Sequence, residues 1–331
     1  MLRYVVTGGV GFIGYHVCRK LLEEGHSVDV IDDFSDAPYP AIEKRRNAAD
    51  LLAQASAQAA RHPDALGGAR LRIHEACVTD ATAIAQHFVG AAAVVHLAGL
   101  AGVRPSFEAA ARYARVNVEG TANVLELARE SGIERVLFAS SSSVYGNSTP
   151  LPAREDAPAV DPESPYAATK RGAELVASAI CKRAPRLRCA ALRFFTVYGP
   201  RQRPEMAITL FMRSILARRP ITIFGDGSMR RDFTHVDDIA RGVLAALARA
   251  PIGFRAYNLG SGAPIDLAAL VSLLGEAAGV TPIVERATVP TGDVEATFAD
   301  IARAREELTW SPRIALRDGL ETVLAWVREH P

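Results

Sequence analysis

The sequence has few of the residues that mark specialised classes of protein. Its 331 residues include four cysteines and two tryptophans, and lysine plus arginine exceed aspartate plus glutamate by one. The cysteines (Cys18, Cys77, Cys181 and Cys189) show no C-x-x-C pair and no metal-ligand spacing, so we expect no disulfide framework, no metal and a cytoplasmic location. The near-zero net charge gives no reason to expect a nucleic acid or an anionic membrane as a partner.

Long apolar runs are also absent. No run reaches the roughly 18 residues that a transmembrane helix needs. The N-terminus enters a strand pattern at once, without the charged and apolar regions of a secretory signal. The remaining composition, 49% hydrophobic and 23% charged, is typical of a globular chain with one domain or two closely packed ones.

Short apolar runs alternate with helical patterns through the first half of the chain. The strand candidates are residues 4–6, 28–31, 71–73, 94–97, 136–139 and 189–192. The helical patterns lie near residues 11–24, 82–88, 108–131 and 166–183. This alternation predicts an α/β fold, a Rossmann-type doubly wound parallel sheet covered on both faces. Between the second and third strands, the Ala-rich residues 41–61 predict an added helix on the surface.

The pattern changes near Pro200, where proline and glycine begin to separate shorter elements. Residues 1–200 are expected to form a dinucleotide-binding domain that carries the catalytic residues, its sheet completed by segments from 230–260. Residues 201–331 are expected to form mainly a smaller α/β lobe over the carboxyl ends of the strands, where open α/β folds bind ligands.

A glycine pattern follows the first strand and opens the first helix. Gly8, Gly11 and Gly14 have the spacing of a loop that lets the backbone approach a diphosphate at a helix N-terminus. Asp32 ends the second strand, where a carboxylate binds both ribose hydroxyls and repels a 2′-phosphate, which favours NAD over NADP. The alternative is a tight turn without a ligand, with Asp32 capping its own loop.

Two further motifs predict a base. Tyr166 and Lys170 are four residues apart and share one face of a helix, so the ammonium group can stabilise a phenolate. Four serines, residues 140–143, directly follow an apolar strand at the end where ligands bind. The alternatives are an exposed Tyr–Lys pair and a polar turn, but the combination predicts proton abstraction beside a nicotinamide.

Together these motifs resemble the extended short-chain dehydrogenase/reductase family, specifically its nucleotide-sugar epimerases. The shared segments are residues 7–14, 96–98, 117–121, 140–146, 193–195, 231–238 and 292–294, with Tyr166 and Lys170. Residues 197–207 and 229–234 are similar to the corresponding pattern of the UDP-glucuronate 4-epimerases. The stretch from Tyr39 to Lys44-Arg45-Arg46 is also similar to it, but more loosely.

The resemblance implies roles for individual residues. Ser141, Tyr166 and Lys170 would be catalytic, with Tyr166 as the base. The NAD-binding positions would be Gly8, Gly11, Phe12, Ile13, Gly14, Asp32, Val78, Leu97, Ala98, Tyr166 and Lys170. The positions that bind a UDP-sugar would be Arg104, Ser142, Ser143, Thr196, Arg203, Arg231 and Asp293.

The implied activity is NAD-dependent 4-epimerisation of UDP-glucuronate to UDP-galacturonate through a transient 4-keto intermediate, by a homodimer. Three departures refine it. Cys77 replaces the family's usual aspartate, which contacts the adenine. Serines at positions 142 and 143 argue against dehydration and decarboxylation. Thr196, in place of the asparagine that is usual in glucose-type 4-epimerases, argues against a neutral sugar. A UDP-glucose or UDP-N-acetylhexosamine 4-epimerase, and a non-catalytic nucleotide-sensing protein, remain alternatives.

Overall fold

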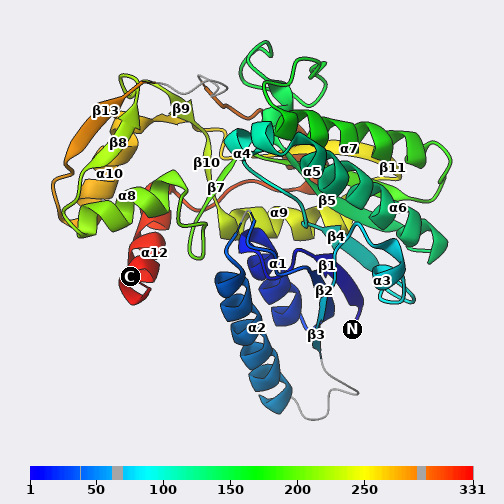
Figure 1. Cartoon of the computed structure of the whole chain (residues 1–331). Helices are drawn as coiled ribbons and strands as arrows, with labels where there is room; N and C mark the ends of the chain where they lie inside the picture. The colour runs from blue at the N-terminus through cyan, green and yellow to red at the C-terminus, as the bar shows by residue number, and fades with distance from the viewer. Residues whose placement is uncertain (38, 62–69, 289–295, 331) are drawn as a thin grey trace.

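The centre of the molecule is a seven-stranded parallel sheet in the order β11-β6-β5-β4-β1-β2-β3 (Figure 1). The computed structural model describes residues 1–37, 39–61, 70–288 and 296–330. The strands are β1 (Arg3–Thr7), β2 (Ser27–Asp32), β3 (Leu71–Glu75), β4 (Ala93–His96), β5 (Arg135–Ser141), β6 (Arg188–Phe194) and β11 (Gly253–Leu259). The predicted doubly wound α/β fold is confirmed.

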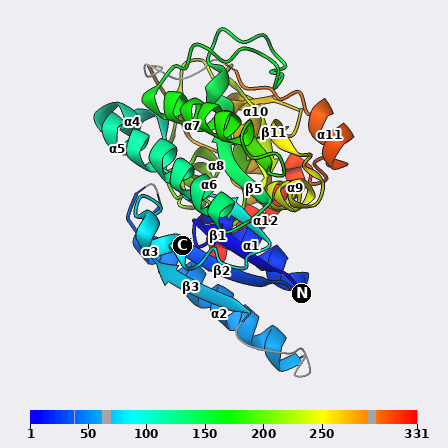
Figure 2. The same cartoon turned by 90° about the vertical axis from the view of Figure 1, so that its right-hand side faces the viewer.

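Helices cover both faces of the sheet, so the central strands are buried on both sides. The helices α1 (Phe12–Glu23) and α9 (Val236–Arg249) pack on one face, and α11 (Ala302–Leu308) packs on α9. On the other face lie α3 (Ala81–Ala85), α6 (Gly120–Glu130) and α7 (Pro165–Cys181) (Figures 1 and 2). Two apolar cores result, one on each side of the sheet.

A second lobe with its own apolar core lies at one side of the sheet (Figure 1). Three helices form it: α8 (Ala207–Leu216), α10 (Leu267–Ala278) and α12 (Leu316–Glu329). They pack with the pair β8 (Ile221–Phe224) and β13 (Val284–Ala287). Two short pairs join the lobes: β7 (Thr196–Tyr198) with β10 (Phe233–His235), and β9 (Arg230–Arg231) with β12 (Ile265–Asp266).

The boundary at residue 200 stays a prediction, but the sheet itself extends past it. The strand β11 pairs with β6 although the chain has by then passed through β8, β9 and β10. Within the described residues, no helix combines the length and the apolarity needed to cross a membrane.

The helix predicted over residues 108–131 is confirmed over residues 110–130, but it contains a π-helical turn. The chain forms α4 (Val103–Glu108), α5 (Ala110–Ala114), a π-helical turn η1 (Arg115–Glu119) and then α6. Ala109, whose backbone (φ −137°, ψ 37°) is not helical, separates this helix from α4. The widened turn places Asn117 inward, where it bonds the Leu100 backbone and Thr169, a use typical of π turns near functional sites.

The added helix α2 (Ala41–Arg61) is present, but the expectation that it is simply a surface helix is wrong. Ala48, Leu51 and Ala55, spaced three and four apart, are buried in the same core as α1. One face of α2 therefore packs against the dinucleotide-binding half while the opposite face meets solvent.

Candidate functional site

A cleft of about 1200 Å³ lies at the carboxyl ends of the parallel strands and reaches residues of the second lobe. Every predicted site residue except Asp293 lines it; Asp293 lies outside the described residues. Those that line it are Gly8, Gly11, Phe12, Ile13, Gly14, Asp32, Val78, Leu97, Ala98, Arg104, Ser141, Ser142, Ser143, Tyr166, Lys170, Thr196, Arg203 and Arg231. Their individual roles stay predictions.

The glycine loop between β1 and α1 forms one end of the cleft. Gly8 has φ +69°, and a Cβ atom there would lie 2.6 Å from the Ala98 backbone nitrogen. A Cβ atom on Gly14 would lie 2.1 Å from the Gly8 carbonyl oxygen. The N-cap residue of α1 is Gly11, which has no side chain that could accept a hydrogen bond from the first N–H groups of the helix. The start of α1 lines the cleft. This cradle fits a diphosphate.

The two aspartates at the end of β2 pair with a lysine that was not among the predicted site residues. Lys44 Nζ of α2 lies 3.1 Å from the Asp32 carboxylate and 3.4 Å from that of Asp33, and all three line the cleft. Burial raises the pKa of Asp32, and the Lys44 charge opposes that rise. The only sequence signal was the loose Tyr39-to-Lys44 similarity. Nearby, the Cys77 thiol lies 3.2 Å from the Thr79 hydroxyl.

The helix α7 positions the predicted base. Its N-cap residue Ser164 accepts a hydrogen bond from Ala167 N at 3.2 Å, and Pro165 occupies the first turn. The Tyr166 phenol that follows hydrogen-bonds Ser141 at the end of β5. One turn later, the Lys170 ammonium donates to the Ala139 carbonyl at 2.8 Å.

Burial controls the ionisation of this group of side chains. Burial raises the pKa of the Tyr166 phenol, while the Ser141 hydrogen bond and the Arg203 charge lower it. Burial lowers the pKa of Lys170 to about 8. Arg203 is thus one cation that acts on the phenol, and the role predicted for Lys170 in stabilising the phenolate stays a prediction.

The wall opposite the glycine loop carries hydroxyls and arginines. Ser141 donates to the Ser143 hydroxyl at 3.1 Å, on the one-turn helix η2 (Ser142–Tyr145). Arg203 is 3.3 Å from Glu205 and 3.2 Å from the Met206 sulfur, with its side chain 18% exposed. Arg104 of α4 stacks on the Phe224 ring of the second lobe at 5.1 Å. These groups can bind an anionic substituent of a sugar.

Comparison with known proteins identifies the family. The profile of the "NAD dependent epimerase/dehydratase family" matches residues 4–260. The chain belongs to this family. It is 38% identical over 330 residues to the UDP-glucuronate 4-epimerase of Thermodesulfobacterium geofontis, an alignment that covers 99% of this chain and 96% of that protein.

Solved structures of two epimerases have the same fold. The Bacillus cereus UDP-glucuronic acid 4-epimerase in complex with UDP-glucuronic acid and NAD matches with a TM-score of 0.87 and 32% identity, over 99% of both chains. The Thermotoga maritima UDP-glucose 4-epimerase with UDP-glucose matches with a TM-score of 0.84 and 28% identity, also over 99% of both chains. Because both sugars occur on this fold, the fold alone does not select the sugar.

In this member of the epimerase/dehydratase family, a buried ion pair that sequence reasoning missed lies behind the serine run. Arg193 of β6 donates two hydrogen bonds of 2.8 Å to the Glu174 carboxylate of α7, and both side chains are almost fully buried. Glu174 also accepts from Ser140 at 2.6 Å, and Arg193 donates to the Tyr145 hydroxyl at 2.9 Å. The partners are 19 residues apart, so no local pattern indicates the pair.

Two histidines near the cleft have structural roles. His96 contacts the Thr7 hydroxyl at 2.6 Å and that of Thr121 at 3.1 Å, and burial lowers its pKa to about 3, so it is neutral. His235 caps α9 and contacts the Thr322 hydroxyl at 3.0 Å. Neither imidazole lines the cleft.

Proposed function

We propose that this protein interconverts UDP-glucuronate and UDP-galacturonate by NAD-dependent epimerisation at C4, without loss of CO₂. The observation that carries this proposal is the placement of Arg203 and the hydroxyls of Ser142, Ser143 and Thr196 in the cleft that contains Tyr166. A base and a carboxylate-binding wall in one cleft suit a uronic acid.

The protein's own groups manage the proton at the sugar C4 hydroxyl. In its phenolate form, Tyr166 accepts this proton directly or through the Ser141 hydroxyl, which hydrogen-bonds the phenol. Bound NAD supplies a reversible acceptor for the C4 hydride. Lys170, held by the Ala139 carbonyl, would also bind the nicotinamide ribose. The 4-ketone turns about its bond to the diphosphate before its carbonyl is reduced on the opposite face.

The same wall protects the intermediate. A 4-keto uronate is a β-keto acid, and it loses CO₂ most readily when the bond to the carboxylate is parallel to the carbonyl π orbitals. Arg203 offers a forked donor, and the three hydroxyls add further donors. Together they hold the carboxylate away from that alignment. Arg231 would bind the diphosphate and Asp293 the nucleotide ribose.

Incubation with UDP-glucuronate, with and without added NAD, tests the function when the nucleotide sugars are resolved by proton NMR. We expect UDP-galacturonate without a UDP-pentose, and turnover without added NAD would indicate retained cofactor. Conversion of UDP-glucose or UDP-N-acetylglucosamine but not UDP-glucuronate would assign a neutral-sugar epimerase. Bound NAD without turnover of any of these sugars would indicate a non-catalytic protein. Tyr166→Phe is the inactive control.

We also propose that the protein is a cytoplasmic homodimer. All four cysteines are free thiols, which suits a reducing compartment. Leu175 on α7 is 55% exposed and Phe107 on α4 is 55% exposed, and such apolar side chains suit a helical interface. Light scattering at several protein concentrations tests the dimer.

A further inference from the structure

The loop that carries Arg203 is held from outside the cleft by another arginine. Residues 199–206 connect β7 to α8, and Gln202 and Arg203 of this loop line the cleft. Arg201 does not line it. Its side chain points instead to the opposite side of the loop, toward α1, α2 and α12, and is only 14% exposed.

Two rings and two polar groups fix the Arg201 guanidinium. It stacks on the Tyr15 ring at 4.0 Å and on the Trp326 ring at 4.6 Å. It donates to Asn47 Oδ1 at 2.5 Å and to Asp50 Oδ2 at 2.7 Å. Because a guanidinium is planar and forked, this combination of stacking and paired hydrogen bonds selects one orientation.

The backbone at Arg201 is unusual. Its φ of +67° lies in the left-handed region, which a residue with a Cβ atom seldom adopts unless its surroundings hold it there. The neighbouring residues are also tied down: Pro200 O contacts His16 Nε2 at 3.0 Å, and Gln202 donates to Val197 O at 2.8 Å. The Arg201 carbonyl accepts from the Tyr39 hydroxyl at 3.1 Å.

The groups that hold Arg201 also touch the dinucleotide end of the cleft. Asn47 donates its amide to the Val10 carbonyl of the glycine loop at 2.9 Å. One turn earlier on the same helix, Lys44 pairs with Asp32. The helix α2 is thus in contact with the glycine loop, with the acid of β2 and with Arg201.

We propose that Arg201 is a positioning residue that sets Arg203 over the substrate end of the cleft by fixing the loop to α1, α2 and α12. This inference rests on the proposed function, because it gives Arg203 the uronate carboxylate to bind. A loop displaced by about 1 Å would misplace the guanidinium that orients the sugar, and a displacement of that size can change rates by up to 100-fold. A neutral sugar, which has no carboxylate, would be far less affected.

Arg201→Lys tests the inference because lysine keeps the charge but loses the planar stacking and the fork. We expect KM for UDP-glucuronate to rise on the order of tenfold, with a new UDP-pentose signal, while the constants for UDP-glucose change less than about twofold. Equal losses on both sugars, or no change on either, would overturn the proposal.

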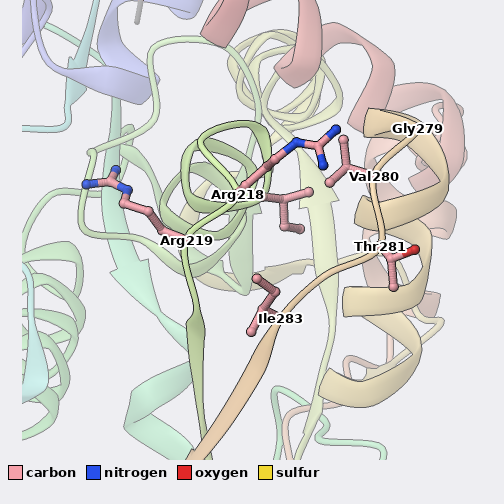
Figure 3. Close-up of a pocket in the computed structure, with 7 residues that line it drawn as sticks. Arg218, Arg219, Gly279, Val280, Thr281 and Ile283 are labelled. Carbon is pink, nitrogen blue, oxygen red and sulfur yellow. The ribbon is translucent and has the colours of Figure 1, made fainter.

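Arg218→Lys is the matched control. Arg218 also has a left-handed backbone, with φ +51°, but it is exposed and lines a separate pocket of about 330 Å³ in the second lobe. Figure 3 shows that its guanidinium and that of Arg219 point apart. Its substitution should leave both KM values unchanged. A rise in KM for UDP-glucuronate as large as that of Arg201→Lys would mean that arginine loss acts nonspecifically and would overturn the proposal.

The wild-type protein separates this test from that of the function. If wild type converts UDP-glucuronate, the ratio of variant to wild type decides the role of Arg201. If wild type acts only on UDP-glucose, the inhibition constant of UDP-glucuronate against that reaction is compared instead, and an unchanged constant in Arg201→Lys refutes the positioning role. Should Arg201→Lys not fold, Asp50→Asn removes the partner charge and should give a smaller change in the same direction.

Discussion

Glu174 accepts a hydrogen bond from Ser140 at 2.6 Å, one residue before the serine expected to act on the substrate. This contact belongs to a regular arrangement. Three successive residues of β5, at 139, 140 and 141, bond three residues of one α7 face, Lys170, Glu174 and Tyr166. Since Tyr166, Lys170 and Glu174 are spaced by four, the buried Glu174 fixes the register of the helix that carries the base.

Replacement of Glu174 by glutamine should strongly destabilise the fold. Arg193 would remain buried with a neutral partner, and breaking such a pair costs about 3–5 kcal/mol. Urea unfolding at pH 7 measures the loss. Glu276→Gln is the control, because it removes an exposed pair with Arg317 and should cost less than about 1 kcal/mol. Similar losses in both variants would contradict the importance of the buried pair.

Acid should weaken the same interaction. Burial raises the pKa of Glu174, but Arg193, Ser140 and Arg171 together outweigh burial and hold this pKa below its usual range. A carboxyl with a lowered folded-state pKa adds stability above its unfolded pKa, and that stability is lost as pH falls through the folded value. Unfolding free energy should therefore fall more steeply below pH 4.5 in wild type than in Glu174→Gln.

Lys170→Met should abolish turnover but stabilise the protein at neutral pH. Burial lowers the pKa of Lys170 to about 8, so the charged form is disfavoured in the folded state. That penalty is present below about pH 8 and disappears as pH rises towards the unfolded value of 10.5. We expect a gain of about 2 kcal/mol at pH 7 that shrinks by pH 10. Lys182→Met, at the exposed end of α7, should show no such pH-dependent gain.

Arg203→Ala should distinguish a uronate from a neutral sugar. Loss of a charged donor from a substrate carboxylate costs on the order of 1–3 kcal/mol. KM for UDP-glucuronate should therefore rise about 10- to 100-fold, while KM for UDP-glucose changes little. Initial rates on the two sugars measure this. Equal losses on both sugars would remove Arg203 from the carboxylate site.

Asp32→Ser should reduce the preference for NAD over NADP. In the wild type, the Lys44 ammonium lies 3.1 Å from the Asp32 carboxylate. The variant removes this carboxylate and would leave the ammonium beside the adenosine ribose. A 2′-phosphate would then meet a cation in place of an anion. Fluorescence titration should show the NAD-to-NADP affinity ratio fall by at least tenfold. Asp33→Ser, whose carboxylate lies 3.4 Å from the same ammonium and is more exposed, should change the ratio less.

Local sequence patterns predicted the parts of this molecule that depend on neighbours in the chain. The glycine loop and the Tyr166–Lys170 spacing can each be recognised from a few neighbouring residues, and the strands of the sheet can be recognised as short apolar runs. The π turn at Arg115–Glu119 was missed because it places Asn117 against Leu100 and Thr169, contacts that exist only in the folded chain. Helix propensity predicts an ordinary α-helix over residues 108–131 and gives no sign of such a turn.

The interactions that hold the cleft in place were not predictable in the same way. Glu174 and Arg193 are both charged, so composition favours a surface position for each until the pairing is known. Arg201 reaches Asn47 and Asp50 across more than 150 residues of sequence. Such contacts are specified by the folded topology, and a single sequence shows only the residue types involved.

The late position of β11 in the sequence affects how this protein can fold during its synthesis on the ribosome. Until residues 253–259 emerge, β6 has no partner on one side and exposes an apolar edge to other chains. Asn258 of β11 also accepts a hydrogen bond from the Tyr145 hydroxyl at 2.6 Å and donates one to the Ala153 carbonyl at 2.8 Å. The segment after Ser140–Ser143 is thus completed only after α8 and β8 of the second lobe have been synthesised. The two halves mature together, and a chain cut at residue 200 would be a substrate for chaperones and aggregation rather than a separable domain.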